Sequence, residues 1–466
     1  MTEFGKTLGI QETSIPGLLI LDLPVHGDSR GWFKENWQRE KMLAAGLPDL
    51  GPVQNNISFN DEVGTTRGIH AEPWDKYVSV ATGKIFGAWV DLREGDSFGK
   101  VFTAELDASK AIFVPRGVAN SYQTLEADTA YVYLVNDHWS PTAEYTFLNL
   151  ADETAAIKWP IPLENALLSE KDQAHPRLKD VVPMKAKKTL VLGANGQLGL
   201  ALRKVMPEAD FVTRTEFDVT DETAYKNFPW KQYSSVINAS AYTAVDAAET
   251  AEGRASAWKT NVTAVGWLAR ACAEHRLTLV HVSSDYVFDG TSSNPYAEGD
   301  SFSPLGVYGQ TKAAADVIVA TVPQHYILRT SWVIGEGNNF VRTMASLAER
   351  GIKPSVVNDQ IGRLTFTQDL AAGIQHLLSS KPEFGTYNLS NDGPASSWAE
   401  IAAQVYELTG QNPADVTGVT TEEYFFGKEG IAKRPHNSML DLKKIESTGF
   451  TPRTWTESLL NYLNKK

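Results

Sequence analysis

A glycine-rich turn places the tightest constraint on the fold of this chain. The stretch T-L-V-L-G-A-N-G-Q-L-G covers residues 189–199, with a glycine at every third position from Gly193 to Gly199. Glycines allow a tight turn and a close approach of the backbone to a pyrophosphate, which accepts hydrogen bonds from the free N–H groups of the following helix. A short apolar run before the turn and a helical pattern after it therefore predict a strand–loop–helix unit that binds a dinucleotide. The helical pattern consists of Leu198, Leu202 and Val205.

A serine, a tyrosine and a lysine follow in the order of a ketone-reducing site. An apolar strand over residues 277–282 delivers Ser284 to its carboxyl end, and Tyr308 and Lys312 come next. If residues 304–320 form a helix, the phenol and the ammonium lie one turn apart on one face, and the cation favours the phenolate. A phenol of lowered pKa can hand a proton to a ketone oxygen while a hydride reaches the carbon. Two surface residues of a helix would show the same spacing, and the glycine-rich turn upstream favours the catalytic interpretation.

Finer motifs in the same region are V-I-N-A-S-A-Y-T-A-V-D-A-A-E (236–249), S-S-D-Y-V-F-D-G (283–290), R-T-S-W-V-I-G (329–335) and N-D-Q-I-G-R-L-T (358–365). Together with the two motifs above they resemble the extended short-chain dehydrogenase/reductase family, and within it the dTDP-4-dehydrorhamnose reductases. This resemblance implies that Tyr308 donates the proton, Lys312 binds the nicotinamide ribose and tunes Tyr308, and Ser284 polarises the ketone. The substrate contacts that it implies are Asp285, Tyr286 and Trp332. The cofactor contacts that it implies are Gly193, Asn195, Gly196, Gln197, Leu198, Gly199, Asp218, Val219, Ala239, Ser240, Ala241, Tyr308 and Lys312.

Arg214 indicates which cofactor to expect. It lies in F-V-T-R-T-E, at the end of the second expected strand of this region. An acidic residue there would favour the free ribose hydroxyls of NADH, whereas an arginine can pair with a 2′-phosphate. We therefore expect NADPH, and NADH stays an alternative if Arg214 is only a solvated turn residue.

Length and composition predict an ordered protein of more than one domain. With 466 residues, of which 42% are hydrophobic and 21% charged, the chain is long enough for two or three domains. Its formal charge of -13 argues against a nucleic-acid polymer as partner. Cys272 is the one cysteine, so no internal disulfide can form, and a cytoplasmic location is expected. No secretion signal is recognisable, and no apolar run approaches the roughly 18 residues of a membrane span, so no membrane partner is expected.

Short alternating strands dominate residues 1 to about 160, where only residues 39–45 look helical. This pattern predicts an antiparallel barrel or jelly roll. Prolines and charges over residues 159–188 predict a linker, after which strands alternate with helices as in a parallel, doubly wound sheet. We therefore expect an all-β, cupin-like domain over residues 1–183 and a Rossmann-like α/β domain over residues 184–466. The expected strands are 18–23, 77–81, 84–91, 101–106, 111–114, 130–135, 189–192, 211–212, 235–238, 278–282 and 325–329. Further helices are expected over residues 398–409 and 455–463.

Four segments of the first part carry a second resemblance: G-D-S-R-G-W-F-K-E (27–35), V-Q-N-N-I-S with T-T-R-G-I-H (53–58, 65–70), A-Y-V-Y-L-V-N-D-H-W-S-P (130–141) and L-S-E-K-D-Q-A-H-P (168–176). In this order they resemble the dTDP-4-dehydrorhamnose 3,5-epimerase family, a cupin-type jelly roll. The resemblance implies that His70 is the general base, Asp172 its carboxylate partner and Tyr133 the acid. The remaining site residues that it implies are Lys76 and Arg67 beside the sugar, and Arg30, Glu35, Gln54 and Asn56 beside the nucleotide.

The chemistry of inversion next to a ketone explains these residue types. A histidine oriented by an aspartate is a suitable base for a C–H bond that the ketone has made acidic. A lysine or arginine can stabilise the enolate, and a tyrosine on the opposite side can return the proton.

Two positions depart from the epimerase pattern. The aspartate expected in I-F-G-A-W-V-D is Gly87, and the histidine expected in P-R-G-V-A-N-S is Asn120. The loss of both leaves open whether C3 and C5 are both inverted. A metal-binding cupin would need H-x-H and two further ligands, whereas only His70 and Glu72 stand here, so no metal is expected.

The two resemblances predict a bifunctional enzyme of dTDP-L-rhamnose biosynthesis. It would epimerise dTDP-4-dehydro-6-deoxy-D-glucose at C3 and C5 and reduce the 4-keto group with NADPH. A homodimer through the jelly-roll domain is an open option. One alternative is a reductase whose cupin domain epimerises one carbon or only binds. Others are a non-catalytic regulator that binds a sugar nucleotide, and a 4,6-dehydratase or 4-epimerase that retains NAD. The presence of Ser284, Tyr308 and Lys312 counts against the regulator.

Overall fold

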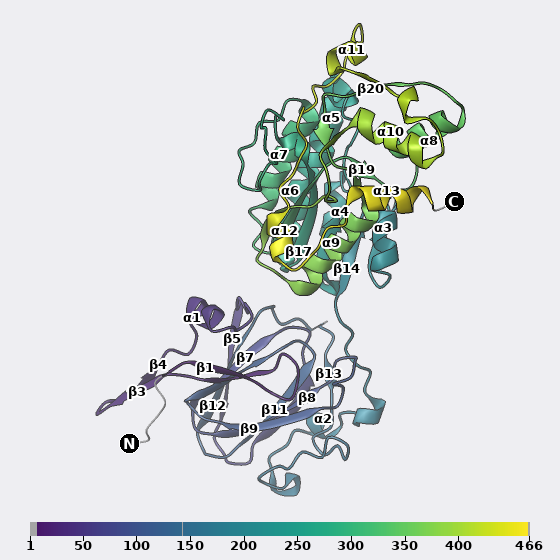
Figure 1. Ribbon diagram of the computed structural model, residues 1–466. Helices are drawn as coiled ribbons and strands as arrows, with labels where there is room; N and C mark the ends of the chain where they lie inside the picture. The colour runs from purple at the N-terminus through teal and green to yellow at the C-terminus, as the bar shows by residue number, and fades with distance from the viewer. Residues whose placement is uncertain (1–6, 142, 465–466) are drawn as a thin grey trace. The chain divides into compact units, whose positions relative to one another are not determined.

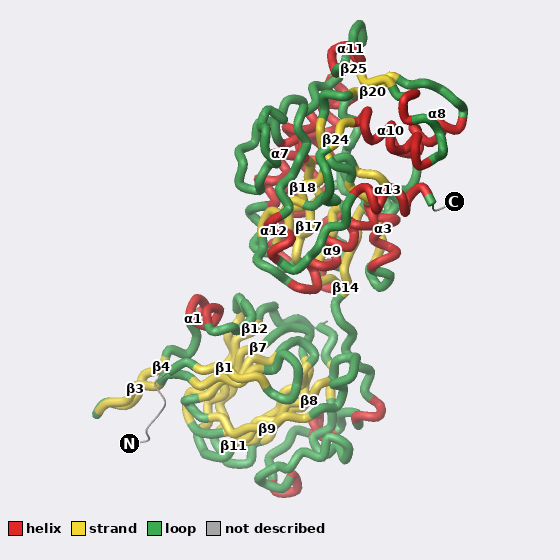
Figure 2. The backbone as a smooth tube through the Cα atoms, viewed as in Figure 1, coloured by secondary structure: helices red, strands yellow, loops and turns green. Residues whose placement is uncertain are grey.

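The computed structural model describes residues 7–141 and 143–464 (Figure 1). Contacts between residues divide the chain into two compact units, Met1–Ala186 and Lys187–Lys466. Strands and loops make up most of the first unit, and the second alternates strands with helices (Figure 2). The expected order of a strand-rich part followed by a parallel-sheet part is therefore confirmed.

Two sheets with antiparallel neighbours form the first unit. The larger sheet has the order β1 (Gly9–Glu12), β2 (Leu19–Asp22), β10 (Lys110–Val114), β7 (Lys76–Thr82), β12 (Thr129–Val135) and β5 (Gln54–Asn60). The smaller sheet has the order β13 (Thr146–Phe147), β6 (Thr66–Ala71), β11 (Val118–Thr124), β8 (Ile85–Asp91) and β9 (Val101–Leu106). A hairpin of β3 (Val25–Asp28) and β4 (Gly31–Lys34) and the helix α1 (Arg39–Ala44) complete this part.

Apolar residues at alternate positions pack the two sheets together. Val78 and Val80 point to one face of β7, and both are fully buried. They share an apolar cluster with Trp89 of β8 and Tyr122 of β11, which belong to the other sheet. The alternating pattern therefore predicted β2, β7, β8, β9, β10 and β12 correctly. It missed β5, β6 and β11, whose residues are largely polar.

Residues 159–188 were expected to form a linker, and the structure corrects this. The segment contains the short helix α2 (Glu170–Gln173), and its apolar residues Leu178, Val181 and Met184 are buried in one cluster with Val90 of β8. Prolines break the regular pattern without preventing these three side chains from packing on the first unit.

A parallel sheet of six strands forms the centre of the second unit. Its order is β15 (Asp210–Val212), β14 (Lys188–Leu192), β16 (Tyr233–Asn238), β17 (Thr278–Ser284), β18 (His325–Thr330) and β23 (Gly385–Asn388). The five strands expected here from the sequence are all present.

Helices cover both faces of this sheet. On one face α6 (Ala264–His275) and α7 (Val307–Val319) pack against Leu190 and Leu192 of β14. On the other face α3 (Gln197–Val205) and α9 (Thr367–Ser380) pack against Val191. Burial on both faces explains why the strands read as continuous apolar runs.

The carboxyl-terminal part of the second unit adds further helices and short strand pairs. Its helices are α8 (Phe340–Glu349), α10 (Trp398–Leu408), α11 (Thr421–Phe425), α12 (Lys443–Ser447) and α13 (Trp455–Leu463). The helices expected from Trp398 and Trp455 are thus confirmed. Within the described residues, no helix combines the length and the apolar character that crossing a membrane requires.

Two candidate active sites

His70 and Asp172 form the polar centre of the first unit. His70 lies on β6 and Asp172 on α2, and His70 Nε2 is 2.9 Å from Asp172 Oδ1. The Gly68 N–H also donates to this carboxylate, at 3.3 Å. Burial raises the pKa of Asp172, but the hydrogen bonds from His70 and Gly68 outweigh it and hold the pKa below its ordinary value. The ionised carboxylate fixes the orientation of the His70 ring.

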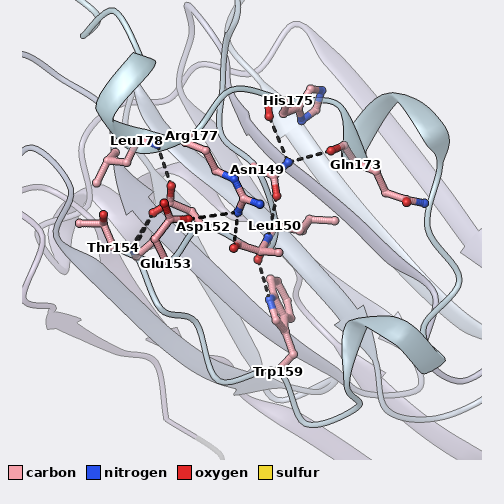
Figure 3. A network of polar contacts seen from close by, with 12 residues as sticks. Asn149, Leu150, Asp152, Glu153, Thr154, Trp159, Gln173, His175, Arg177 and Leu178 are labelled. Carbon is pink, nitrogen blue, oxygen red and sulfur yellow. Dashed lines mark hydrogen bonds and ion pairs between the residues drawn. The ribbon is translucent and has the colours of Figure 1, made fainter.

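A network of polar contacts fixes the segment that carries Asp172 (Figure 3). Asn149 Nδ2 donates to the carbonyl oxygens of Gln173, at 2.7 Å, and His175, at 3.1 Å, directly after Asp172 in the chain. The Leu178 N–H donates to Asp152 Oδ2 at 2.7 Å. Asn149 therefore positions Asp172 although it is itself remote in sequence. We did not predict this role, because an asparagine in a loop carries no signal of its partners.

Lys76 and Tyr133 lie beside each other on the neighbouring strands β7 and β12. Lys76 Nζ is 4.6 Å from the centre of the Tyr133 ring, and it forms an ion pair with Glu72. The side chains of Lys76 and Glu72 are only 6% and 9% exposed. Burial, followed by the Glu72 carboxylate, raises the pKa of Tyr133, so the phenol keeps the proton that an acid must donate. The sequence suggested Glu72 only as a metal ligand, whereas in the structure it pairs with Lys76.

The two departures from the epimerase pattern are accommodated by neighbouring side chains. A Cβ at Gly87 would collide with the Trp89 ring, which fills the space beside this strand. Asn120 is buried, accepts a hydrogen bond from the Tyr131 hydroxyl at 2.7 Å and donates to the His70 carbonyl at 3.2 Å. The backbone of His70 therefore keeps a polar support at this position.

The nucleotide-side residues on the strands lie near the acid. Asn56 pairs in register with Tyr133, and its Oδ1 accepts a hydrogen bond from Gln54 Nε2 at 2.9 Å. Arg67, on the same strand as His70, donates to Asn60 Oδ1 at 3.1 Å. These contacts place Asn56 and Gln54 beside Tyr133 and tie Arg67 of β6 to β5.

The other two nucleotide-side residues pair with their own neighbours. Arg30 lies at the turn of the β3–β4 hairpin, is 88% exposed and pairs with Asp28. Glu35 follows the hairpin and forms an ion pair with Lys41 at 2.8 Å. Within the described residues, the hydrogen bonds of these two side chains go to Asp28 and Lys41, and none reaches His70 or Tyr133.

His175 is a further side chain at this centre. It stacks on Phe147 at 4.7 Å between ring centres, and its Nε2 is 3.9 Å from Asp172 Oδ1. Burial, followed by the charge of His70, lowers the pKa of His175, so the ring stays neutral. His70, Asp172 and His175 are the one group of the described residues with the composition of a metal site, their ligand atoms lying within 4.8 Å of one another.

The glycine-rich turn of the second unit has the geometry expected of a phosphate-binding loop. Gly193 has φ +86°, and a Cβ there would lie 2.8 Å from the backbone of Ala239. Helix α3 begins at Gln197 without a side-chain cap, so its first N–H groups are available to an anion. The turn thus brings Gly193 next to Ala239 and Ser240, and Ala241 follows directly.

Arg214 and Asp218 lie beyond the second strand of this sheet. Arg214 is 80% exposed, and its Nε donates to Asp218 Oδ2 at 3.2 Å. Burial raises the pKa of Asp218, but hydrogen bonds from Thr220 and Arg214 outweigh burial and hold this pKa below its ordinary value. Val219 follows, and its carbonyl accepts a hydrogen bond from Tyr225 at 2.9 Å. An exposed guanidinium at this strand end is free to turn toward a phosphate.

The serine, tyrosine and lysine come together at the carboxyl end of β17. Ser284 is its last residue, and its Oγ donates to Asp285 Oδ1 at 2.9 Å. Tyr308 and Lys312 lie on α7, and Tyr286 packs edge-on against Tyr308 at 5.4 Å between ring centres. Burial raises the pKa of Asp285 to about 6, although hydrogen bonds with Ser438 and Ser284 act to lower it.

The structure changes the expected ionisation of Tyr308. The sequence led us to expect a lowered pKa, whereas burial, followed by the charge of Asp285, raises the pKa of Tyr308 to about 12. The Tyr308 ring is half-buried, and the buried Lys312 Nζ is turned to the Val282 carbonyl, to which it donates at 2.7 Å. Tyr308 therefore holds its proton before the cofactor binds, which suits a proton donor.

Two further residues shape this site. Asn261 lies in a π-helical turn, Lys259–Thr263, and its side chain bonds the backbone of Tyr242 and the hydroxyl of Thr311 on α7. We did not predict a role for Asn261. Its only signal in the sequence is that a polar residue stands where the helical pattern would place an apolar one. Trp332, expected at the substrate, has φ +45° and stacks on Trp398 at 3.8 Å between ring centres.

A parallel sheet with a phosphate-binding turn, and a serine–tyrosine–lysine set at the end of its strand β17, define the second unit as a reductase of the short-chain dehydrogenase class. Family comparison agrees: residues 187–466 match the RmlD substrate binding domain, and residues 12–180 match the dTDP-4-dehydrorhamnose 3,5-epimerases. The chain belongs to both families, one in each unit.

Individual relatives cover the two units separately. The first part is 53% identical over 197 residues to "Protein RmlC homolog" of Streptococcus pyogenes, spanning 40% of this chain and 99% of that protein. The second part is 37% identical over 294 residues to dTDP-4-dehydrorhamnose reductase of Aggregatibacter actinomycetemcomitans, spanning 58% of this chain and 97% of that protein. The solved structure of the Bacillus anthracis dTDP-4-dehydrorhamnose reductase in complex with NADP is 31% identical, with a TM-score of 0.56, and spans 60% of this chain and 99% of that one.

Proposed function

We propose that this chain epimerises dTDP-4-dehydro-6-deoxy-D-glucose at C3 and C5 in its first unit. The second unit then reduces the 4-keto group with NADPH to give dTDP-L-rhamnose. The observation that carries this proposal is that one chain assembles both proton-transfer sets, His70 with Asp172 and Tyr133, and Ser284 with Tyr308 and Lys312. Epimerisation is reversible, so reduction by the same chain draws it toward product.

In the first unit, each epimerisation begins with a proton transfer to His70. The base removes a proton from the carbon next to the ketone, and the electron pair of that bond moves to the ketone oxygen. The Lys76 ammonium stabilises the resulting enolate, while Asp172 stabilises the imidazolium. Tyr133 returns a proton to the same carbon from the other side, which inverts it. The pKa of Tyr133, raised first by burial, supports its role as the acid.

In the second unit, the ketone oxygen receives its proton from Tyr308. NADPH, when bound, supplies the hydride to the carbonyl carbon. Ser284 orients and polarises the carbonyl, and Lys312 holds the nicotinamide ribose. Asp285, Tyr286 and Trp332 would contact the substrate.

We assign the first activity to residues 1–183, as a cupin-type jelly roll, and the second to residues 184–466, as a Rossmann-like doubly wound sheet. The contact division after Ala186 and the two family matches support these bounds. The glycine-rich turn and the exposed Arg214 support NADPH as the cofactor. The hydrogen bond between His70 and Asp172 supports proton transfer without a metal in the first unit. The one buried cysteine, Cys272, suits a reducing, cytoplasmic setting.

We also propose a homodimer through the first unit. β5 is an edge strand of the larger sheet, and its outward side chains Ile57 and Phe59 are 67% and 55% exposed. Phe33 in the β3–β4 hairpin is 69% exposed. An edge strand with exposed apolar side chains is a surface that a second copy of the chain can cover. Sedimentation of the full chain should show a dimer, and Ile57→Lys should shift it toward the monomer.

The direct test of function is product analysis. The full chain, dTDP-4-dehydro-6-deoxy-D-glucose and NADPH should give dTDP-L-rhamnose, with one NADPH oxidised for each sugar formed. His70→Ala should stop formation of the L-sugar, and Tyr308→Phe should stop NADPH oxidation. A regulator would oxidise no NADPH, and a 4,6-dehydratase or 4-epimerase would release no oxidised cofactor.

A further inference from the structure

A buried histidine lies behind the lysine of the second site and has no part in the mechanism above. His281, on β17, is 1% exposed. Its Nε2 is 3.2 Å from Lys312 Nζ, and its Nδ1 is 3.2 Å from Asn238 Nδ2 at the end of β16. Burial holds the pKa of His281 well below its ordinary value, so the ring is neutral and carries one N–H.

The neighbours of Asn238 decide which ring nitrogen carries that proton. The Ser240 backbone N–H donates to Asn238 Oδ1 at 3.2 Å, and the Ser240 hydroxyl donates to the same oxygen at 2.6 Å. A backbone N–H can only donate, so the amide oxygen faces Ser240 and the amide nitrogen faces His281. The amide nitrogen also only donates, so His281 Nδ1 accepts and the ring proton lies on Nε2.

This tautomer restricts the charge of Lys312. Lys312 Nζ already donates to the Val282 carbonyl at 2.7 Å. A neutral amine has a lone pair left to accept the hydrogen bond from His281 Nε2–H, whereas an ammonium has none and would place two donors against each other.

We propose that His281 is a positioning residue: fixed by Asn238 with its proton on Nε2, it donates to the Lys312 amine and holds that amine neutral in the cofactor-free protein. A series of hydrogen bonds thereby links the expected cofactor loop to the charge of the catalytic lysine. It runs from Ser240 through Asn238 and His281 to Lys312. This inference rests on the proposed function of the second unit.

The other charged groups around Lys312 act in both directions. Burial lowers the pKa of Lys312 to about 8, and Asp316, one turn further along α7, opposes this. Asp316 is itself paired with Arg329 of β18 at 3.0 Å, which reduces its effect. The other titratable groups near Lys312 are Asp285, in the turn after β17, and Tyr308. The N–H of His281 acts in the same direction as burial.

A neutral Lys312 has a consequence for Tyr308. An ammonium beside the phenol would lower its pKa, whereas a neutral amine leaves the pKa of Tyr308 raised by burial and by Asp285.

An isosteric change at Asn238 should reverse the tautomer. In Asn238→Asp, one carboxylate oxygen keeps the bonds from Ser240 and the other accepts from His281 Nδ1–H, so Nε2 turns into an acceptor for a Lys312 ammonium. Lysine Cε can be labelled with ¹³C in the full, cofactor-free chain, and the Lys312 signal assigned by its loss in Lys312→Arg. The midpoint of its titration should rise by about one pH unit or more in Asn238→Asp. The exposed Lys188 serves as the internal reference, and its midpoint should not move.

A double-mutant cycle separates the ring from the added charge. In the His281→Leu background, Asn238→Asp should raise the midpoint by less than half as much, because only the through-space effect of the carboxylate is left. His281→Leu alone should raise the midpoint as well, which keeps the test decisive if Asn238→Asp does not fold. An unchanged midpoint in His281→Leu, or an equal effect of Asn238→Asp with and without His281, would overturn the inference. The titration requires no catalytic turnover. Its result therefore tests the role of His281 even if the chain does not have the proposed reductase activity.

Discussion

Lys76 Nζ lies 4.6 Å from the centre of the Tyr133 ring and forms its ion pair with Glu72. The acid proposed for epimerisation therefore shares its surroundings with a buried pair of opposite charges. The pKa of Tyr133 depends on this pair as well, because the Glu72 carboxylate is the second cause of its rise after burial.

Glu72→Gln should destabilise the first unit. It leaves the Lys76 ammonium buried without its counter-charge, and breaking a buried pair costs about 3–5 kcal/mol of unfolding free energy. Replacing both partners, in Glu72→Leu with Lys76→Met, should cost less. The exposed pair Lys84–Glu105 is the control, and Glu105→Gln should change the unfolding free energy by under about 1 kcal/mol. Denaturant unfolding measures all of these, and equal losses for Glu72→Gln and Glu105→Gln would contradict the prediction.

The stabilising effect of Asp172 should depend on pH in a defined direction. Its pKa is lower in the folded protein than the ordinary value of about 3.9, because His70 and Gly68 bind the ionised form. The unfolded chain therefore takes up the proton first, and the contribution of Asp172 is complete above about pH 4 and is lost as pH falls further. Asp172→Asn should be less stable than the unchanged protein at pH 7, and the difference in unfolding free energy should shrink toward pH 3. A difference that grew on acidification would show that the sign is wrong.

Tyr308→Phe should reduce turnover of the ketone by roughly a hundredfold or more, since it deletes the proton donor. Cofactor binding should stay nearly intact, because the ring and its packing against Tyr286 are kept. Steady-state NADPH oxidation and fluorescence titration measure the two effects separately. Tyr406→Phe, which loses a hydroxyl bonded to the remote Ile352 carbonyl, is the matched control and should keep full activity. Full turnover in Tyr308→Phe would show that Tyr308 is not the proton donor.

Arg214→Ala should weaken NADPH binding about tenfold and leave NADH binding almost unchanged, because only the contact with the 2′-phosphate is lost. Dissociation constants for both cofactors test this. Arg270→Ala removes another exposed arginine, one that pairs with Glu222, and should affect neither. If the unchanged protein already prefers NADH, the role given to Arg214 is wrong.

Local patterns predicted the elements of this chain better than its long-range contacts. The helix from Trp455 to Leu463 and the strand before Gly193 follow from periodicity and from turn chemistry, which act over a few residues. The pairing of His70 with Asp172 joins residues more than a hundred positions apart, and only the family resemblance pointed to it. The π-helical turn around Asn261 changes the hydrogen bonding of the helix backbone, for which the side chains give no periodic signal.

Burial caused the other errors. A tyrosine and a lysine at helical spacing suggested a lowered phenol pKa, and the direction is reversed by the burial of Tyr308 and the charge of Asp285. The prolines of residues 159–188 suggested a linker, although Leu178 and Met184 had enough apolar surface to pack on the first unit. Packing of this kind depends on the partner surface, which a single segment does not reveal.

The last prediction concerns the two carbons of epimerisation. His70, Asp172 and Tyr133 are all in place, which favours proton exchange at C3 and C5. Gly87 and Asn120 replace two residues of the family pattern, yet the Trp89 ring fills the first position and Asn120 supports the His70 backbone at the second. The chain, given the 4-keto substrate in heavy water without NADPH, should therefore incorporate deuterium at both carbons, and His70→Ala should stop it. Deuterium at one carbon alone would restrict the first unit to a single epimerisation and change the product sugar. A folded protein that exchanges neither carbon would leave the first unit as a binding domain.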